Sequence, residues 1–351
     1  MADSIEPDPL SGVLRSLRLT GALFFLWEVS WPFATPVPAG RAFAPLVLPG
    51  AQQIVSYHIV MRGVCWGALL GEPPAQLEAG DILLIPHGDA YLLSSSAQAC
   101  AAGPLDMAPS LEFFRQMAAG AMPFVVQEGG GEPTSTHLIC GFLGCDVRPF
   151  NPALAALPRL VRLRPPADPA ADRLQSLIDY TLAEAQRPSP GSQCVLLRLS
   201  ELMFVEVVRR WLAGAEANAA GAAARSNWLA GLRDPLVGRA LLQLHRRPAA
   251  AWTLETLASE VGASRSRLAE SFTRFVGQPP MQYLTQWRLQ LAARMLADSA
   301  VKVAAVARDF GYQSEASFSR AFKRFVGVSP AQWRREARAD KPRLQSSIRR
   351  G

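Results

Sequence analysis

The pattern of apolar and polar positions in the last third of the chain occurs twice, as an internal repeat. Five positions recur with an offset of 50 residues: Leu268, Phe272, Phe275, Gly277 and Pro280 return as Phe318, Phe322, Phe325, Gly327 and Pro330. The apolar residues of each copy follow the i, i+4, i+7 spacing of an amphipathic helix. A shorter apolar stripe precedes each copy and ends in a glycine, Gly262 or Gly311. Each copy therefore predicts two helices joined by a tight turn, which is the helix-turn-helix pattern.

Residues at the predicted helix starts agree with this assignment. Thr253 and Ser264 can cap the helices of the first copy, and Ser314 can cap the second helix of the second copy. Lys302 occupies the remaining start, so that helix should be less well capped. One helix over Met281–Leu296 is expected to join the copies, with a length of roughly 24 Å. With its flanks it could set two recognition helices near the ~34 Å spacing of successive major grooves.

A specific family resemblance lies in the second copy. Its residues are Gly311-Tyr312-x-Ser314-x3-Phe318-x3-Phe322-Lys323-x-Phe325-x-Gly327-x2-Pro330, followed by Trp333. This run and the doubled spacing resemble the DNA-binding domain of the AraC/XylS family of bacterial transcription regulators. The resemblance implies a tandem helix-turn-helix domain over residues 231–336, a function in transcription regulation, double-stranded DNA as a partner and RNA polymerase as a further partner.

The resemblance also implies which side chains contact DNA, because the start of a recognition helix faces base edges. The predicted DNA-binding residues are Arg265, Ser266, Arg267 and Glu270 in the first copy, and Gln313, Ser314, Glu315, Ser317, Ser319, Arg320 and Lys323 in the second. Glu270 departs from the basic or amide residue often found at its position. It could accept a hydrogen bond from cytosine N4, or pair with Arg267 or Arg274.

The distribution of charge supports a polyanionic partner for this part of the chain alone. The formal net charge is +7. Residues 231–351 carry 21 Lys and Arg against 9 Asp and Glu, which is +12, and residues 1–230 carry 15 against 20, which is −5. A basic segment beside a mildly acidic one is typical of a nucleic-acid-binding domain joined to a domain with another task.

The first 150 residues have a different pattern, with short apolar runs between glycines and prolines. The predicted strands are Leu19–Val29, Ile54–Met61, Val64–Leu70, Gln76–Glu78, Ile82–Ile85, Tyr91–Ser94 and His137–Gly144. The second and third of these are separated only by Arg62-Gly63 and are expected to pair as a hairpin. Many short strands at this spacing predict a small barrel or a double-sheet roll.

Several short motifs in this region resemble cupins. The run Gly80-Asp81-x4-Pro86-His87-Gly88 resembles the second cupin motif, and it is accompanied by Tyr57-His58, Gly63-x-Cys65-Trp66 and Cys140-Gly141. Together they are similar to the cupin-type sensor domain of one branch of AraC-like regulators. The expected fold is therefore α+β, with a cupin-like sensor domain over 10–150, a helical pair over 165–213 and the all-α tandem helix-turn-helix domain.

The helical pair and its flanks have two interpretations. Amphipathic segments at Pro169–Ala185 and Cys194–Leu212 predict two helices. They could form the surface of a homodimer or simply cover the barrel. Residues 215–227 are rich in alanine and are expected to be an interdomain linker. A loose start over residues 1–10 and a disordered basic tail from Arg338 are also expected.

An enzymatic function finds little support in the motifs. The chain has no nucleophile elbow, HExxH motif or Gly-rich phosphate loop, and only four histidines. Many cupins hold a metal with His and Glu, and His58, His87 and His137 with Tyr91 could contribute ligands. Histidines satisfied by the backbone are the favoured interpretation, so we predict no catalytic residue, no metal and no cofactor. The alternative is a metal-dependent cupin enzyme with an appended DNA-binding domain.

The nature of the signal is left between two hypotheses. The sensor residues we single out are Cys65, Cys140, His58 and His87. Cys140 could react with an oxidant or electrophile if its thiolate is accessible, whereas a buried thiol would be inert. The rival is a small-molecule ligand inside the barrel, between His58 and His87. An acidic start and an apolar run broken by Glu28 and Pro32 predict no signal peptide or membrane span, hence a cytoplasmic protein.

Overall fold

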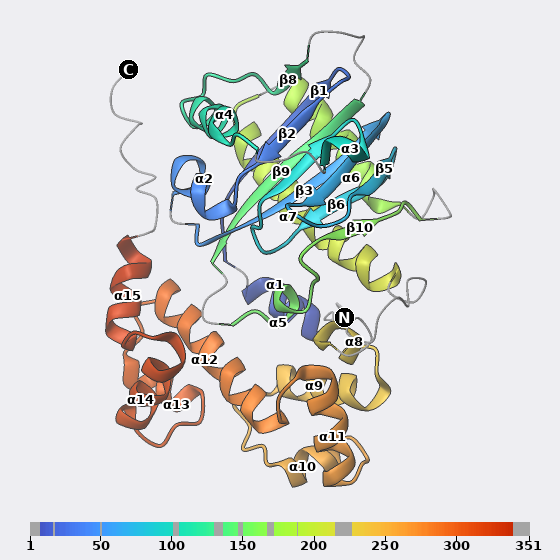
Figure 1. Ribbon diagram of the computed structural model, residues 1–351. Coiled ribbons are helices and arrows are strands. Elements are labelled where there is room, and N and C mark those ends of the chain that lie inside the picture. Colours follow the sequence, from blue (N-terminus) through green and yellow to red (C-terminus); the bar gives the residue numbers. More distant parts are fainter. Residues whose placement is uncertain are drawn as a thin grey trace. The chain divides into compact units, whose positions relative to one another are not determined.

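The computed structural model describes residues 8–16, 18–49, 51–100, 105–129, 136–146, 150–166, 172–187, 189–214 and 227–339. These divide into two compact units (Figure 1). We call residues 18–146 and 157–214 the β unit, and residues 8–16, 150–156 and 227–339 the helical unit. Most of the predicted linker, the tail beyond residue 339 and the first seven residues lie outside the described part.

The β unit consists of two facing sheets. The larger has the order β10-β6-β3-β9-β1-β8 and contains β1 (Arg18–Val29), β3 (Gln53–Arg62), β6 (Ile82–Ile85), β8 (Val125–Glu128), β9 (Thr136–Asp146) and β10 (Val161–Leu163). The smaller has the order β2-β7-β4-β5 and contains β2 (Ala34–Val37), β4 (Val64–Leu69), β5 (Ala75–Glu78) and β7 (Tyr91–Ser94). All pairs are antiparallel except β1 with β8. The expected double-sheet fold is confirmed.

The predicted hairpin between the second and third strands is wrong. β3 pairs with β6 and β9 in the larger sheet, whereas β4 pairs with β5 and β7 in the smaller one. Between them Gly63 has a φ of 82°, which glycine adopts without steric cost. The turn therefore carries the chain from one sheet to the other. The two apolar strands bury their side chains in a shared core rather than against each other.

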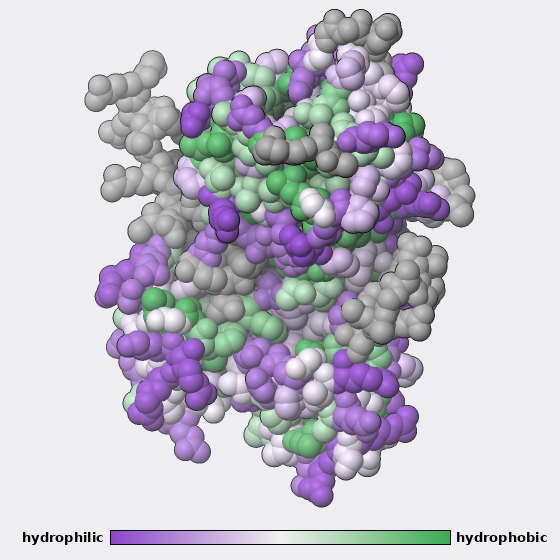
Figure 2. All heavy atoms as spheres, in the orientation of Figure 1, coloured by the Kyte–Doolittle hydropathy of each residue, from purple (hydrophilic) through white to green (hydrophobic). Residues whose placement is uncertain are grey.

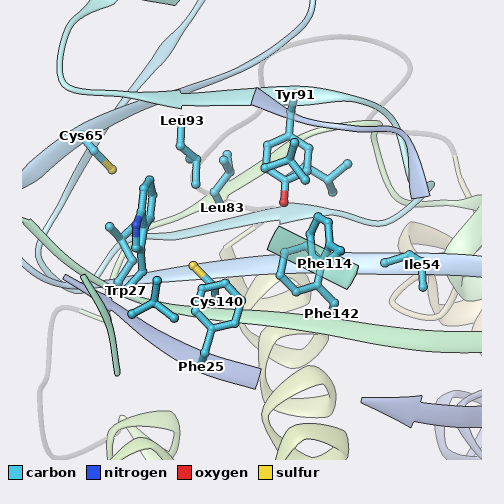
Figure 3. Packing of buried hydrophobic residues seen from close by; sticks show 14 of the residues in the cluster. Phe25, Trp27, Ile54, Cys65, Leu83, Tyr91, Leu93, Phe114, Cys140 and Phe142 are labelled. Atoms are coloured by element: carbon cyan, nitrogen blue, oxygen red, sulfur yellow. The ribbon is translucent and has the colours of Figure 1, made fainter. Parts of the chain in front are cut away.

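Aromatic and aliphatic side chains together fill the core between the sheets (Figure 3). Phe25 of β1 and Phe142 of β9 have ring centroids 6.2 Å apart. Two helices that the sequence analysis did not predict, α2 (Gly40–Val47) and α4 (Ala108–Ala118), contribute to the same core. Their rings of Phe43 and Phe114 stack at 4.1 Å. A short helix, α3 (Ala97–Cys100), follows β7.

The predicted helical pair is present as α6 (Arg173–Gln186) and α7 (Ser192–Gly214). Asp172 caps α6 by accepting from the amides of Leu174 and Gln175. The two helices pack on each other, and α7 also contacts β1, β9 and β10. The pair therefore covers the larger sheet, and it still leaves two large apolar side chains, Tyr180 at 53% and Leu202 at 51%, exposed.

The helical unit contains both helix-turn-helix motifs. Its helices are α1 (Pro9–Ser16), α5 (Pro152–Ala155), α8 (Trp228–Gly231), α9 (Pro235–Arg246), α10 (Leu254–Glu260), α11 (Arg265–Val276), α12 (Pro280–Asp298), α13 (Val303–Asp309), α14 (Glu315–Val326) and α15 (Pro330–Ala339). Thr253, Ser264 and Ser314 cap their helices, and Lys302 makes no side-chain cap. Phe318, Phe322 and Trp333 pack with α12 in the core of the second motif.

The pairing of β3 with β9 predicts that Gly141 does not tolerate a larger residue. Gly141 lies opposite Tyr57, and an added Cβ there would overlap the tyrosine ring. We expect Gly141→Ala to lower the unfolding free energy by about 3 kcal/mol, since neither strand can move in the middle of the sheet. The matched control is Gly71→Ala. An added Cβ at Gly71 would have nothing within 4 Å, and only its φ of +81° is unfavourable for alanine. We expect this variant to lose about 1–2 kcal/mol of unfolding free energy. Denaturant unfolding of both variants checks this, and equal losses would contradict it.

Candidate DNA interface and effector cavity

The two recognition helices each divide into a buried and an exposed face. Leu268 and Phe272 of α11, and Phe318 and Phe322 of α14, are fully buried. Most predicted DNA-binding residues lie on the opposite, exposed faces: Arg265, Ser266, Arg267, Glu270, Gln313, Ser314, Glu315, Arg320 and Lys323, with Ser317 and Ser319 half-buried. Hydrophilic residues predominate over this part of the helical unit (Figure 2). The structure thus presents the predicted set at the surface.

Two of the predicted residues have local structural tasks as well. The Ser314 hydroxyl oxygen accepts from the amide of Ser317 at 3.1 Å, and the Ser317 hydroxyl donates to the Ser314 carbonyl at 2.8 Å. These bonds close the first turn of α14 and fix the direction in which the helix begins. Removing either hydroxyl would therefore weaken the helix start in addition to any contact with DNA.

The helix between the motifs is longer than predicted. α12 has 19 residues, which corresponds to roughly 28 Å. Arg288 on α12 donates to the carbonyl oxygens of Pro248 and Ala250, each at 2.6 Å. These two bonds tie the middle of α12 to the loop that precedes α10, so the connecting helix is anchored to the first motif.

A pocket of about 610 Å³, open to solvent on one side, extends into the β unit. We call it the cavity. Its walls combine aromatic rings from three elements with a few polar groups near β2, β8 and α4. The principal wall residues are Phe25 and Trp27 of β1, Phe113 and Phe114 of α4, His58 of β3, and Cys140 and Phe142 of β9. The sequence analysis missed the aromatic residues of this set. Phe25 and Trp27, two residues apart on one strand, were a usable signal, because alternate residues share one face of a sheet.

His58 and Cys140, both predicted as sensor residues, lie together in this cavity. His58 Nδ1 is 3.1 Å from Cys140 Sγ, and His58 Nε2 is 2.5 Å from the Tyr91 hydroxyl. Burial lowers the pKa of His58 to about 3, so the imidazole is neutral at physiological pH. Burial also raises the pKa of Cys140 well above its usual value, which keeps the thiol protonated.

The other two predicted sensor residues lie elsewhere. His87 Nε2 donates to the Leu157 carbonyl at 2.9 Å, and His87 does not line the cavity. Cys65 is fully buried on β4, and burial raises its pKa to about 12. β4 belongs to the smaller sheet, so Cys65 is not on a strand adjacent to Cys140. Cys145, five residues after Cys140 on β9, donates to the Gln53 carbonyl.

The histidines do not form a metal site. Within the described parts of the chain, no three His, Cys, Asp or Glu side chains converge as metal ligands. Both ring nitrogens of His58 have protein partners, and His137 Nδ1 lies 3.7 Å from Glu28 instead. These residues do not fit the His-and-Glu set that many cupins use.

Comparison with known proteins assigns a family to each part of the chain. Residues 8–213 match the model of the cupin family, and residues 257–336 match a helix-turn-helix domain. A protein of Streptomyces antibioticus, named as an AraC-like transcription regulator, is 33% identical over 330 residues, covering 93% of this chain and 98% of its own length. The RCS-specific HTH-type transcriptional activator RclR of Escherichia coli is 31% identical over 207 residues, covering 58% and 69%. The DNA-binding domain of AdpA, solved with a target DNA, is 31% identical over 31% of this chain and 98% of that one, with a TM-score of 0.30.

The fold and these matches define a DNA-binding transcription regulator with a cupin sensor domain and a tandem helix-turn-helix domain. The chain belongs to the AraC family of transcription regulators. Its relatives are transcription regulators and not enzymes. None of the helices in the described ranges combines the length and the apolar character needed to cross a bilayer.

The depressed pKa of His58 predicts how the β unit responds to acid. The unfolded chain binds a proton below the usual pKa of 6.5, whereas the folded unit does so only near 3, so stability is lost as pH falls between these values. From pH 6.5 to pH 5 the loss should be about 2 kcal/mol. Hydrogen exchange of the β3 amides measures it locally. His58→Asn should flatten the pH dependence over this range, and an unchanged slope in that variant would contradict the assignment.

Proposed function

We propose that the cupin domain binds an apolar small molecule in its cavity, and that occupancy of the cavity controls DNA binding by the tandem helix-turn-helix domain. The observation that carries this proposal is the 610 Å³ cavity with aromatic walls in the core of the β unit. The cavity opens to solvent at its polar end, and its volume is within the range of ligand pockets.

The charges around the cavity support a neutral or cationic ligand over an anion. Among the described residues, its walls include the carboxylates of Asp106 and Glu128 but no Lys or Arg. His58 is the remaining basic group, and it is neutral at physiological pH. A ligand carboxylate would find no counter-charge there, whereas a cation could contact the face of an aromatic ring such as Trp27.

Oxidant sensing at Cys140 is the second candidate. It is favoured by the 3.1 Å contact with His58 and by the similarity to RclR, which is named RCS-specific. The raised pKa of the Cys140 thiol weighs against it, because the thiolate is the reactive form. We therefore place the ligand hypothesis first.

The partners follow from the same assignment. The exposed faces of α11 and α14 read adjacent segments of double-stranded DNA, and RNA polymerase is the downstream partner. Tyr180 and Leu202, the exposed apolar residues of α6 and α7, support a homodimer formed through this helical pair.

Ligands with a common ten-carbon chain test the charge preference. Decanol and decyltrimethylammonium should raise the unfolding temperature of the full-length protein, and decanoate at equal concentration should not. Calorimetric titration then gives the affinities. Glu128→Gln should weaken binding of the cation by roughly two- to fivefold and leave the alcohol unchanged. Glu112→Gln is the matched control, since Glu112 lies on α4 outside the cavity wall.

Two outcomes would count against this assignment. Preferred binding of decanoate would contradict the charge argument. If none of the three compounds binds, while hypochlorous acid alters DNA binding of the wild type but not of Cys140→Ser, the redox hypothesis replaces the ligand hypothesis.

Arg320 on the exposed face of α14 tests the DNA interface. We expect Arg320→Ala to weaken binding to the preferred site by about 1–3 kcal/mol and to relax base preference. Arg324→Ala, one turn further along the same helix and also exposed, is the matched control and should lower affinity without changing preference. Binding to preferred and scrambled duplexes is compared for both variants. An equal loss on the two duplexes would make Arg320 a phosphate contact.

A further inference from the structure

Residues from the middle of the chain complete the helical unit. The amide of Phe150 donates to Gln290 Oε1 at 2.9 Å, and Gln290, on α12, is only 3% exposed. Asn151 caps the short helix α5, whose three residues Pro152, Ala153 and Leu154 are buried. The Asn227 side chain donates to the Ala156 carbonyl. Residues 150–156 are therefore part of the packed DNA-binding unit, although they lie more than 70 residues before α8 in the sequence.

The ring of Phe150 lies at the junction of the two helix-turn-helix motifs. Its centroid is 5.9 Å from that of Tyr283 and 6.3 Å from that of Phe325, both with edge-to-face geometry. Tyr283 packs on Phe272 of the first recognition helix at 5.7 Å. Phe325 is in the last turn of the second recognition helix. Phe150 thus contacts the second motif directly through Phe325, and it reaches the first motif through Tyr283 of α12, which packs on Phe272.

We infer that Phe150 is a positioning residue that sets the orientation of α11 relative to α14, and so the spacing of the two DNA half-sites that one chain reads. α12 links the motifs covalently, but a single helix does not by itself fix the rotation of what is packed at either end. The edge-to-face contacts of Phe150 and its hydrogen bond to the middle of α12 supply a third point of attachment. Edge-to-face aromatic contacts favour a defined geometry, unlike a merely apolar contact.

Phe150 lies close in sequence to the strand that lines the cavity. Only three residues separate it from Asp146, the end of β9, and β9 carries the cavity residues Cys140 and Phe142. The spacing function itself does not require the cavity to bind anything.

DNA spacing provides the test, with the full-length protein throughout. A preferred duplex is first selected from a random pool with the wild type, and duplexes with one base pair inserted or deleted between the half-sites are then compared. We expect Phe150→Ala to lower affinity for the selected spacing by roughly three- to tenfold and to lose less on the altered spacings, so that discrimination between spacings falls. Phe150→Tyr keeps an aromatic ring and should retain the wild-type discrimination between spacings.

Two controls keep the result decisive. Val13→Ala trims a fully buried side chain of α1, which packs on α9, α12 and α5, and should leave discrimination between spacings intact. If Phe150→Ala does not fold, Phe150→Leu is measured by the same criterion. A spacing profile identical to that of the wild type, or a uniform loss on every duplex, would overturn the inference. Because no effector is added, this result is independent of whether the cavity binds a ligand.

Discussion

The DNA-binding unit depends on a hydrogen bond between segments 140 residues apart, from the Phe150 amide to the Gln290 side chain. Gln290 is buried, so losing this hydrogen bond would cost about 1 kcal/mol. The bond therefore holds residues 150–156 against α12 with a defined register, and the aromatic contacts of Phe150 follow from that register. Residues 150–156 are thus part of the same packed unit as both helix-turn-helix motifs, although they come from a distant part of the chain.

In the sensor, apolar packing and uncharged polar groups define the site. Its cavity is bounded by rings that pack closely on one side, such as Phe43 on Phe114, and face empty space on the other. His58 and Cys140 share this space, and His58 also contacts the hydroxyl of Tyr91, which does not line the cavity. All three groups are uncharged. Burial selects neutrality for all three, since a charge in this environment would lose its hydration without gaining an ion pair. A site with neutral polar groups and aromatic walls is suited to recognising shape and apolar surface.

The sequence predicted the elements whose signals are local and repeated. The helix starts at Ser264 and Ser314 and the strand Ile82–Ile85 were predictable because capping and apolar runs act over a few residues. The hairpin at Gly63 was wrong because strand pairing is decided by which sheet completes the core. The cavity, and α2 and α4 beside it, arise from packing between distant segments. Phe150 carries no local signal at all, since its role exists only where residues 283, 290 and 325 have been brought together.

The place of α1 in the helical unit has a consequence for biosynthesis. Gly12 lies so close to α9 and α12 that a Cβ added to it would be 3.2 Å from His245 Nδ1 and 3.7 Å from Trp287 Cζ2. These partners are made 233 and 275 residues later. At about 5–20 residues per second, α1 waits roughly 14–55 s before Trp287 has been synthesised. During that interval the β unit can fold completely, because it ends before α8 and α9 in the sequence. Among the described helices, α1 therefore waits longest for its native contacts, and the helical unit is completed only after the whole β unit has been synthesised.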